Sequence, residues 1–211
     1  AVDRFAEYLA DPDPFLRSLA VRGMGCVPGK EADQFLSMAL NDVEPGVVAT
    51  AIGQLARRDS LGTTSRLLIR KLDTEDNALL AVQLVRALQQ LGSTDGVEPA
   101  LHVAAIDRSP ALVGAVAASA SKSCVSRAVP FIDSLLRVDG PDVRAACADA
   151  FGLIRQNSII PRLARLTNDE QPIVRAAAFN NLMTVDTSNH DLYLRTALND
   201  SDFVLNALAI D

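Results

Sequence analysis

The chain has 211 residues, a formal net charge of −6, 49% apolar residues and 22% charged residues. This composition is that of a globular protein and excludes a disordered chain. The negative charge argues against binding to nucleic acid or to an anionic membrane. Three scattered cysteines (Cys26, Cys124 and Cys147) exclude a disulfide framework and a zinc knuckle. No secretory signal or membrane-length apolar run is visible, so the cytoplasm is the expected location.

One short motif occurs twice at a fixed distance. "PDVRAACADAFG" begins at Pro141, and "PIVRAAAFNNL" begins at Pro172, 31 residues later. Similar steps along the chain place seven anchors in one column: Pro14, Pro45, Asp76, Pro110, Pro141, Pro172 and Phe203. Three residues before the anchor, the column reads Asp11, Asp42, Asp73, Asp107, Val138, Asp169 and Asp200, and Asp139 follows the exception.

Three further columns are apolar in every row. Nine residues before the anchor stand Phe5, Leu36, Leu67, Leu101, Ile132, Leu163 and Leu194. Two residues after it stand Leu16, Val47, Ala78, Leu112, Val143, Val174 and Leu205. Six residues after it stand Ala20, Ala51, Val82, Val116, Cys147, Ala178 and Ala209. The last two columns predict one buried face of a helix, and the small residues predict close approach of a neighbouring helix.

Each repeat is therefore predicted to be a helix, a turn and a second helix. An Asp in the turn can accept hydrogen bonds from backbone N–H groups, and Pro suits the first position of a helix. A two-helix unit buries its apolar face only by stacking on its neighbours, which predicts an all-α fold, an α-solenoid of about seven repeats in one domain. The predicted repeats cover 1–27, 31–58, 61–92, 95–122, 125–156, 157–185 and, incompletely, 187–211.

The segments "DPDPFLRSLA", "DGPDVRAACADAFG" and "DEQPIVRAAAFNNL" resemble HEAT repeats, in particular the short HEAT-like repeats of phycobilisome bilin lyases and many bacterial proteins. The resemblance covers nearly the whole chain. It implies an armadillo-type superhelix, and the family includes scaffolds, adaptors, regulators and a few lyases. It also implies a ladder of Asp and Arg side chains along the stack. Arg17, Arg144 and Arg175 fit this ladder, whereas other residues replace Arg in the remaining rows: Val48, Leu79, Val113 and Asn206.

No catalytic, cofactor or metal site is expected. His102 and His190 are far apart in the sequence, and the repeated His-Glu pairs that a HEAT-like deoxyhypusine hydroxylase would need are absent. Cys147 belongs to a buried column, and Cys124 has no readable base beside it. The glycines of "RGMGCVPGK" follow no predicted strand and precede no Gly-Lys-Ser, so they indicate a connecting loop.

The outward face of the second helices is the predicted binding surface. Residues one, four and eight positions after the anchor should point away from the core there. Six of them are the candidate partner-binding residues: Phe15, Arg22, Leu80, Leu84, Asp149 and Asn180. Two alternatives stay open for Leu80 and Leu84, which are either apolar anchors of a shallow groove or core residues displaced by a one-residue register shift in the third repeat.

The sequence favours a non-catalytic scaffold or adaptor that binds another protein or a peptide, with no cofactor, no nucleic acid and no membrane as partner. The alternative is a subunit of a bilin lyase-like enzyme. A nucleic acid-binding HEAT-like protein is disfavoured by the acidic charge and the few aromatic residues. The last row, "DSDFVLNALAID", ends on apolar residues without a polar cap. We expect either that the chain is part of a longer protein or that self-association covers this end.

Overall fold

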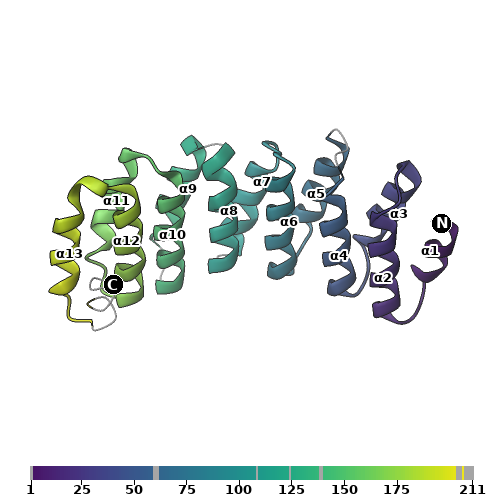
Figure 1. Ribbon diagram of the computed structural model, residues 1–211, viewed down its shortest axis with the longest axis horizontal. Coiled ribbons are helices and arrows are strands. Elements are labelled where there is room, and N and C mark those ends of the chain that lie inside the picture. The colour runs from purple at the N-terminus through teal and green to yellow at the C-terminus, as the bar shows by residue number, and fades with distance from the viewer. Residues whose placement is uncertain are drawn as a thin grey trace. The chain divides into compact units, whose positions relative to one another are not determined.

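The computed structural model describes residues 2–58, 62–107, 109–123, 125–137, 140–202 and 206. In these residues the chain forms thirteen α-helices and two short 3-10 helices (Figure 1). The chain divides into two compact units, residues 1–103 and 104–211, and each is described by itself.

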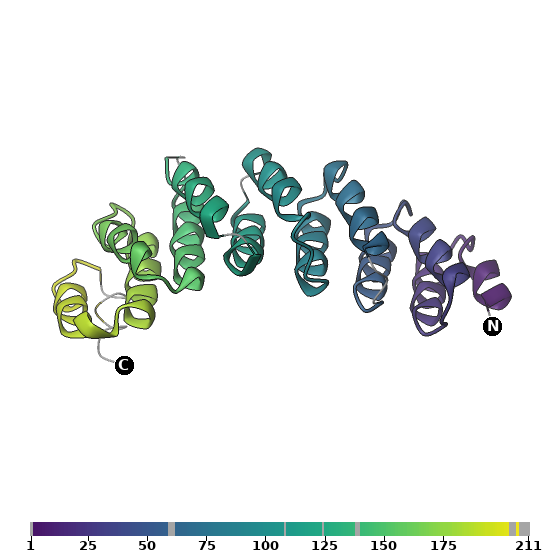
Figure 2. The ribbon, with the colours of Figure 1, turned by 90° about the horizontal axis from the view of Figure 1, so that it is seen from above.

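The first unit is built from helix pairs. Its helices are α1 (Val2–Tyr8), α2 (Pro14–Gly25), α3 (Lys30–Ala39), α4 (Pro45–Leu55), α5 (Thr63–Asp73) and α6 (Ala78–Gln90), and α7 (Val97–Ile106) runs across the boundary. α1 packs on α2, α3 packs on α4, and α5 packs on α6. The second helices α2, α4 and α6 also pack on one another in order, so that they form one layer with α3 and α5 behind it (Figures 1 and 2).

The second unit follows the same plan. Its elements are α8 (Pro110–Ser123), α9 (Val125–Leu135), α10 (Pro141–Ile154), η1 (Asn157–Ile159), α11 (Ile160–Leu166), α12 (Pro172–Val185), η2 (Thr187–Asn189) and α13 (His190–Leu198). α10 lies between α8 and α12, while α9 and α11 cover α10 and α12. The described residues contain no strand. The all-α fold class and the stacking of helix pairs are therefore confirmed.

The predicted turn chemistry is present. In five turns the carboxylate three residues before the anchor position accepts a hydrogen bond from the backbone N–H two residues later. The pairs are Asp13 N–Asp11 (2.8 Å), Glu44 N–Asp42 (2.9 Å), Ser109 N–Asp107 (3.1 Å), Gln171 N–Asp169 (2.9 Å) and Asp202 N–Asp200 (2.8 Å). Proline then opens the helix, as it does in α2, α4, α8, α10 and α12. The exceptional row with Val138 and Asp139 lies outside the described residues.

The third repeat corrects the predicted register. Helix α6 begins at Ala78, and the Asn77 side chain caps it by accepting hydrogen bonds from the backbone N–H groups of Leu79 (3.0 Å) and Leu80 (3.3 Å). Glu75 takes the place of the turn Asp, because it accepts a hydrogen bond from the Asn77 N–H at 3.0 Å. The anchor of this repeat is therefore Ala78 rather than Asp76, a shift of two residues.

The apolar columns form the core of each unit. The small residues six positions after the anchor are buried: Ala20, Ala51, Val116, Cys147 and Ala178. Two positions after the anchor, Val47, Leu112, Val143 and Val174 are also buried. Leu16 and Phe5, in the first repeat, are half-buried. The columns therefore mark the faces along which neighbouring second helices pack.

The close-approach column makes a testable prediction. Ala178 is fully buried in α12. Enlarging it in Ala178→Phe should overpack the second unit and lower the free energy of unfolding by about 1–3 kcal/mol. Asp142→Ser, at an exposed site in the first turn of α10, should change it by no more than about 0.5 kcal/mol. Urea unfolding followed by circular dichroism measures both variants, and equal midpoints would contradict this packing.

Candidate functional site

The second helices of the second unit line a shallow, open hollow of about 630 Å³. The residues that line it come from α8, α10 and α12: Pro110, Gly114, Asp142, Ala145, Ala146, Asp149, Ile173, Ala176, Ala177 and Asn180. We call this hollow the α8–α12 groove. It lies on the face that the sequence predicts for binding, because seven of its ten lining residues belong to the predicted outward positions.

Small side chains form most of the lining of the α8–α12 groove, so the backbone of a bound segment could approach the helices closely. The larger lining residues are Ile173, whose side chain is 51% exposed, and Asn180. Asp142 and Asp149 are the charged residues of the lining, which holds no Lys or Arg. The groove is therefore acidic, with one apolar side chain that a partner could cover.

One side chain of α12 orders the acidic edge of the groove. The Asn181 amide donates one hydrogen bond from Nδ2 to Asp149 Oδ1 (2.8 Å) and another to the carbonyl oxygen of Ala177 (2.8 Å). Asp149 remains exposed. Asp142 stands in the first turn of α10, where the helix dipole stabilises a negative charge. Both carboxylates line the hollow, where a cationic partner could contact them.

The six predicted partner-binding residues have different positions. Asp149 and Asn180 line the same groove. Phe15, with 71% of its surface exposed, and Arg22 lie on α2 in the first unit and are also exposed. Leu80 and Leu84 are only 5% and 0% exposed. Their interpretation as surface anchors is wrong, because the corrected register places them in the two core columns. The core alternative is right, with a shift of two residues instead of one.

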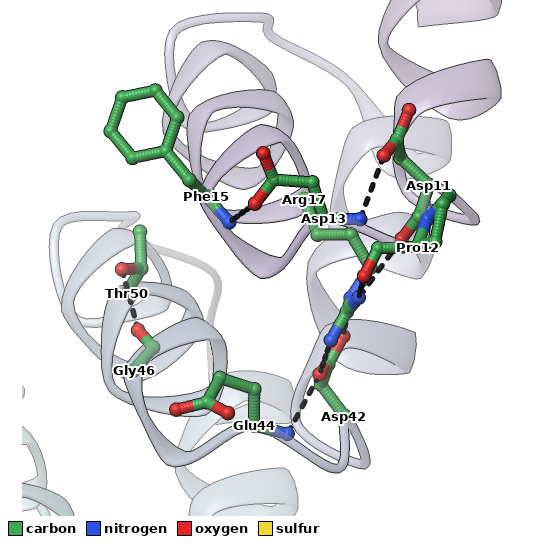
Figure 3. A network of polar contacts seen from close by, with 9 residues as sticks. All are labelled: Asp11, Pro12, Asp13, Phe15, Arg17, Asp42, Glu44, Gly46 and Thr50. Atoms are coloured by element: carbon green, nitrogen blue, oxygen red, sulfur yellow. Dashed lines mark hydrogen bonds and ion pairs between the residues drawn. The ribbon is translucent and has the colours of Figure 1, made fainter.

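The Asp and Arg side chains of the turns form the ion pairs that the resemblance implies. Arg17 donates two hydrogen bonds to Asp42 of the next repeat, both at 2.8 Å. Its third guanidinium nitrogen donates to the carbonyl oxygens of Asp11 (2.9 Å) and Pro12 (3.1 Å) in its own turn (Figure 3). The hydrogen bonds from Arg17 lower the pKa of Asp42. This pair joins two consecutive repeats.

The same Arg–Asp pair occurs twice in the second unit, but it is absent at α4, α6 and α8. Arg144 pairs with Asp169 (2.8 and 2.9 Å), and Arg175 pairs with Asp200 (2.7 and 2.6 Å). Buried apolar residues occupy the equivalent position in α4, α6 and α8: Val48, Ala81 and Val113. In α6 this residue is Ala81 and not Leu79, which is 73% exposed. The ion pairs of the ladder therefore stabilise the turns, and none of the ladder arginines lines the α8–α12 groove.

The titratable residues considered for chemistry have other roles. His190 is hydrogen-bonded through Nε2 to the Met183 carbonyl oxygen (2.7 Å), which ties α13 to α12, and His102 is exposed. Cys147 is fully buried, and this burial raises the pKa of its thiol to about 12. Cys124 lies outside the described residues. Among the side chains that the structure describes, no group of three or more His, Cys, Asp or Glu residues could hold a metal ion. In the same part of the chain, no helix is long and apolar enough to cross a membrane.

Comparisons with known proteins agree with this architecture. Residues 131–211 match the family of HEAT repeats. The complex of CpcE and CpcF of phycocyanin lyase from Nostoc sp. PCC7120 is similar over 100% of this chain and 92% of its own, with a TM-score of 0.57 and 15% identity. Human deoxyhypusine hydroxylase is similar over 100% of this chain and 94% of its own, with a TM-score of 0.41 and 15% identity. A designed armadillo repeat protein is similar over 88% of this chain and 100% of its own, with a TM-score of 0.46 and 17% identity. No curated protein sequence matches the chain.

The resemblance that the turn motifs indicate is therefore confirmed at two levels. The family match covers the last repeats, which contain α10, α12 and their ladder arginines. The similarity to the phycocyanin lyase complex extends the same fold over the whole length of the chain. The described residues therefore form an all-α solenoid of stacked helix pairs, and residues 131–211 are similar to HEAT repeats.

Proposed function

We propose that this chain is a protein-binding solenoid without a catalytic centre of its own, and that the α8–α12 groove binds a segment of a partner protein. The observation that carries this proposal is the groove of about 630 Å³ on the outward face of the second helices. Its small lining residues allow close contact with a backbone, and Ile173 offers an apolar contact. Helix-in-groove and extended-peptide recognition both use surfaces of this kind.

The negative charge of the groove favours a positively charged partner segment. Asp142 and Asp149 face the hollow without a Lys or Arg among the lining residues. A bound segment with Lys or Arg side chains would neutralise both carboxylates, whereas an acidic segment would be repelled. We therefore expect the partner segment to be basic, with a small apolar residue that contacts Ile173.

A photo-crosslinking residue tests the groove directly. Placed at Asn180, it should form a cross-link to the partner in cells of the source organism, and mass spectrometry should locate that link in a basic segment. The same residue at exposed Asp191, on α13, serves as the matched position outside the groove. Cross-links of equal yield from both positions, or a link to an acidic segment, would contradict the proposal.

Charge reversal supplies the quantitative prediction. Asp149→Lys should weaken binding of the cross-linked segment, made as a synthetic peptide, by at least about tenfold, because it turns an attractive contact into a repulsive one. Asp191→Lys makes the same charge change outside the groove and should leave the affinity within about twofold. Titration of a fluorescent peptide measures both constants. Equal affinities of the two variants would show that the segment binds elsewhere.

The second candidate function is that of a subunit in a bilin lyase-like complex. The similarity to the complex of CpcE and CpcF of phycocyanin lyase favours this candidate over an unspecialised scaffold, because it extends over 100% of this chain and 92% of that one. The two candidates share the binding of another protein. They differ in whether that binding serves a reaction at a bilin.

An attachment assay distinguishes the two candidates. If the chain is a lyase subunit, genes of phycobiliprotein components should lie near its own gene, and the chain should be needed for covalent attachment of a bilin to an apo-phycobiliprotein. Attachment is detected as zinc-induced fluorescence of the denatured protein on a gel. The assay should include the partner protein that the cross-linking experiment identifies. If the attachment yield is then the same with and without the chain, the lyase candidate is contradicted and the non-catalytic binding function remains.

A further inference from the structure

A second cavity, of about 640 Å³, lies in the second unit and gathers arginine side chains. Arg137 follows the end of α9, Arg144 belongs to α10, and Arg162 and Arg165 belong to α11. All four line the cavity, and we call it the arginine pocket. None of them lines the α8–α12 groove, so the two hollows have separate walls.

Two carboxylates of the lining are already occupied. Asp169 accepts two hydrogen bonds from Arg144, and the Gln171 backbone N–H donates to it as well. Asp133 accepts three hydrogen bonds from Arg162, at 2.9, 3.0 and 2.9 Å. These contacts fix the planes of two guanidinium groups, so their positive charge stays at the wall of the pocket in a defined orientation.

The other two arginines have no such partner among the residues that the structure describes. The side chains of Arg137 and Arg165 are exposed, and neither makes an ion pair or a side-chain hydrogen bond with a described residue. The lining thus holds four guanidinium groups against two carboxylates, an excess of two positive charges in a chain whose net charge is −6. A further carboxylate, Glu170, approaches Arg144 at 3.6 Å from an exposed position outside the lining.

From this arrangement we infer that the arginine pocket binds the phosphate group of a small organic molecule. A guanidinium group presents a planar fork of donors that fits phosphate oxygens, and two forks from different helices can bind different oxygens of one tetrahedral group. A phosphate dianion could bridge Arg137 and Arg165, the two arginines of the lining that pair with no described carboxylate. Leu136 and Leu166 supply apolar lining for the rest of the ligand, and the cavity has the size usual for small-molecule sites.

Inorganic pyrophosphate and inorganic phosphate are the probes for this inference, with acetate at the same ionic strength as the comparison. The Nε–H signals of the arginines in a two-dimensional NMR spectrum report the binding site. We expect saturable shifts of the Arg137 and Arg165 signals with both phosphates, and binding of acetate that is at least about tenfold weaker because it carries one negative charge. Signals that do not move, or that move equally with acetate, would overturn the inference.

Substitutions locate the effect. Arg137→Gln and Arg165→Gln remove exposed side chains, so the fold should be unchanged in the circular dichroism spectrum. Each should weaken pyrophosphate binding roughly tenfold, because a charge-assisted hydrogen bond is lost. Arg195→Gln, an exposed site on α13 outside the pocket, makes the same charge change and should not alter the affinity. Equal losses in all three variants would show unspecific attraction of anions and would overturn the assignment.

Discussion

Leu84→Asp is expected to unfold the helices around α6. Leu84 is fully buried, at the core position that the corrected register assigns to it. The substitution removes the packing of a leucine, which costs roughly 2–5 kcal/mol, and places a carboxyl group without a partner in an apolar site. The sum is comparable with the whole stability of a typical domain, about 5–15 kcal/mol.

Leu79→Asp is the matched control for this prediction. It makes the same chemical change on the same helix, at a side chain that is 73% exposed. Its position in the first turn of α6 also suits a negative charge. Hydrogen exchange should show lost protection in α4, α5 and α6 of Leu84→Asp and native protection in Leu79→Asp. Equal protection of the two variants would contradict the assignment of Leu84 to the core.

Arg175→Met should have the second largest effect. The Arg175 side chain is 11% exposed and that of Asp200 is 12% exposed. Arg175 donates two hydrogen bonds to Asp200, and it also donates to the carbonyl oxygens of Asp169 (3.0 Å) and Glu170 (3.1 Å). Removing the guanidinium leaves a partly buried carboxylate without its cation, which should lower the free energy of unfolding by about 2–4 kcal/mol at pH 7.

This effect should depend on pH in a defined direction. Hydrogen bonds from Arg175 hold the pKa of Asp200 below its ordinary value. The pair therefore contributes its full stabilisation above the pKa of an unfolded Asp, about 3.9, and loses it as the pH falls through the lower pKa of the folded state. The difference between the wild type and Arg175→Met should be largest at neutral pH and shrink below about pH 4.

Urea unfolding at a series of pH values measures this difference. Arg195→Met, at an exposed arginine of α13, is the control and should cost no more than about 0.5 kcal/mol at any pH. A difference between the wild type and Arg175→Met that grows as the pH falls would contradict the assigned role of the ion pair.

The sequence predicts those parts of the fold that depend on local chemistry. The turn Asp accepts a hydrogen bond from a backbone N–H group, and the Pro occupies the first helical position. Both act within one turn, so both can be recognised in the sequence. The third repeat lacks both residues, because Ala78 stands where five of the other repeats have Pro, and Glu75 replaces the turn Asp. The residues 78–82 are all apolar, so their pattern fits more than one register. For this reason the sequence alone is compatible with Leu80 and Leu84 at the surface or in the core.

The candidate sites depend on contacts between repeats and are less visible in the sequence. The outward positions of Asp149 and Asn180 follow from helix periodicity, and both line the α8–α12 groove. Which second helices enclose a hollow depends on their packing, which no local signal encodes. The arginine pocket was missed because Arg137 and Arg165 belong to separate repeats and stand outside the predicted columns. The positive charge of these two arginines can be recognised as unbalanced only once the structure shows that Asp133 and Asp169 pair with the other two arginines.

The fit between Gly152 and Asn181 shows that the repeats are not interchangeable modules. A Cβ atom at Gly152 in α10 would lie 2.9 Å from the Cβ of Asn181 in α12, closer than real Cβ atoms approach. Gly25 in α2 stands eleven residues after its anchor, as Gly152 does, and a Cβ there would lie 2.8 Å from the Cγ of Gln54 in α4. Other repeats have larger residues at this position of the sequence: Ala56, Gln89, Ser121 and Met183. A chain rearranged by duplication or exchange of repeats would therefore have to keep Gly152 next to Asn181, whose Cβ, unlike the outer atoms of Gln54, cannot move without the helix.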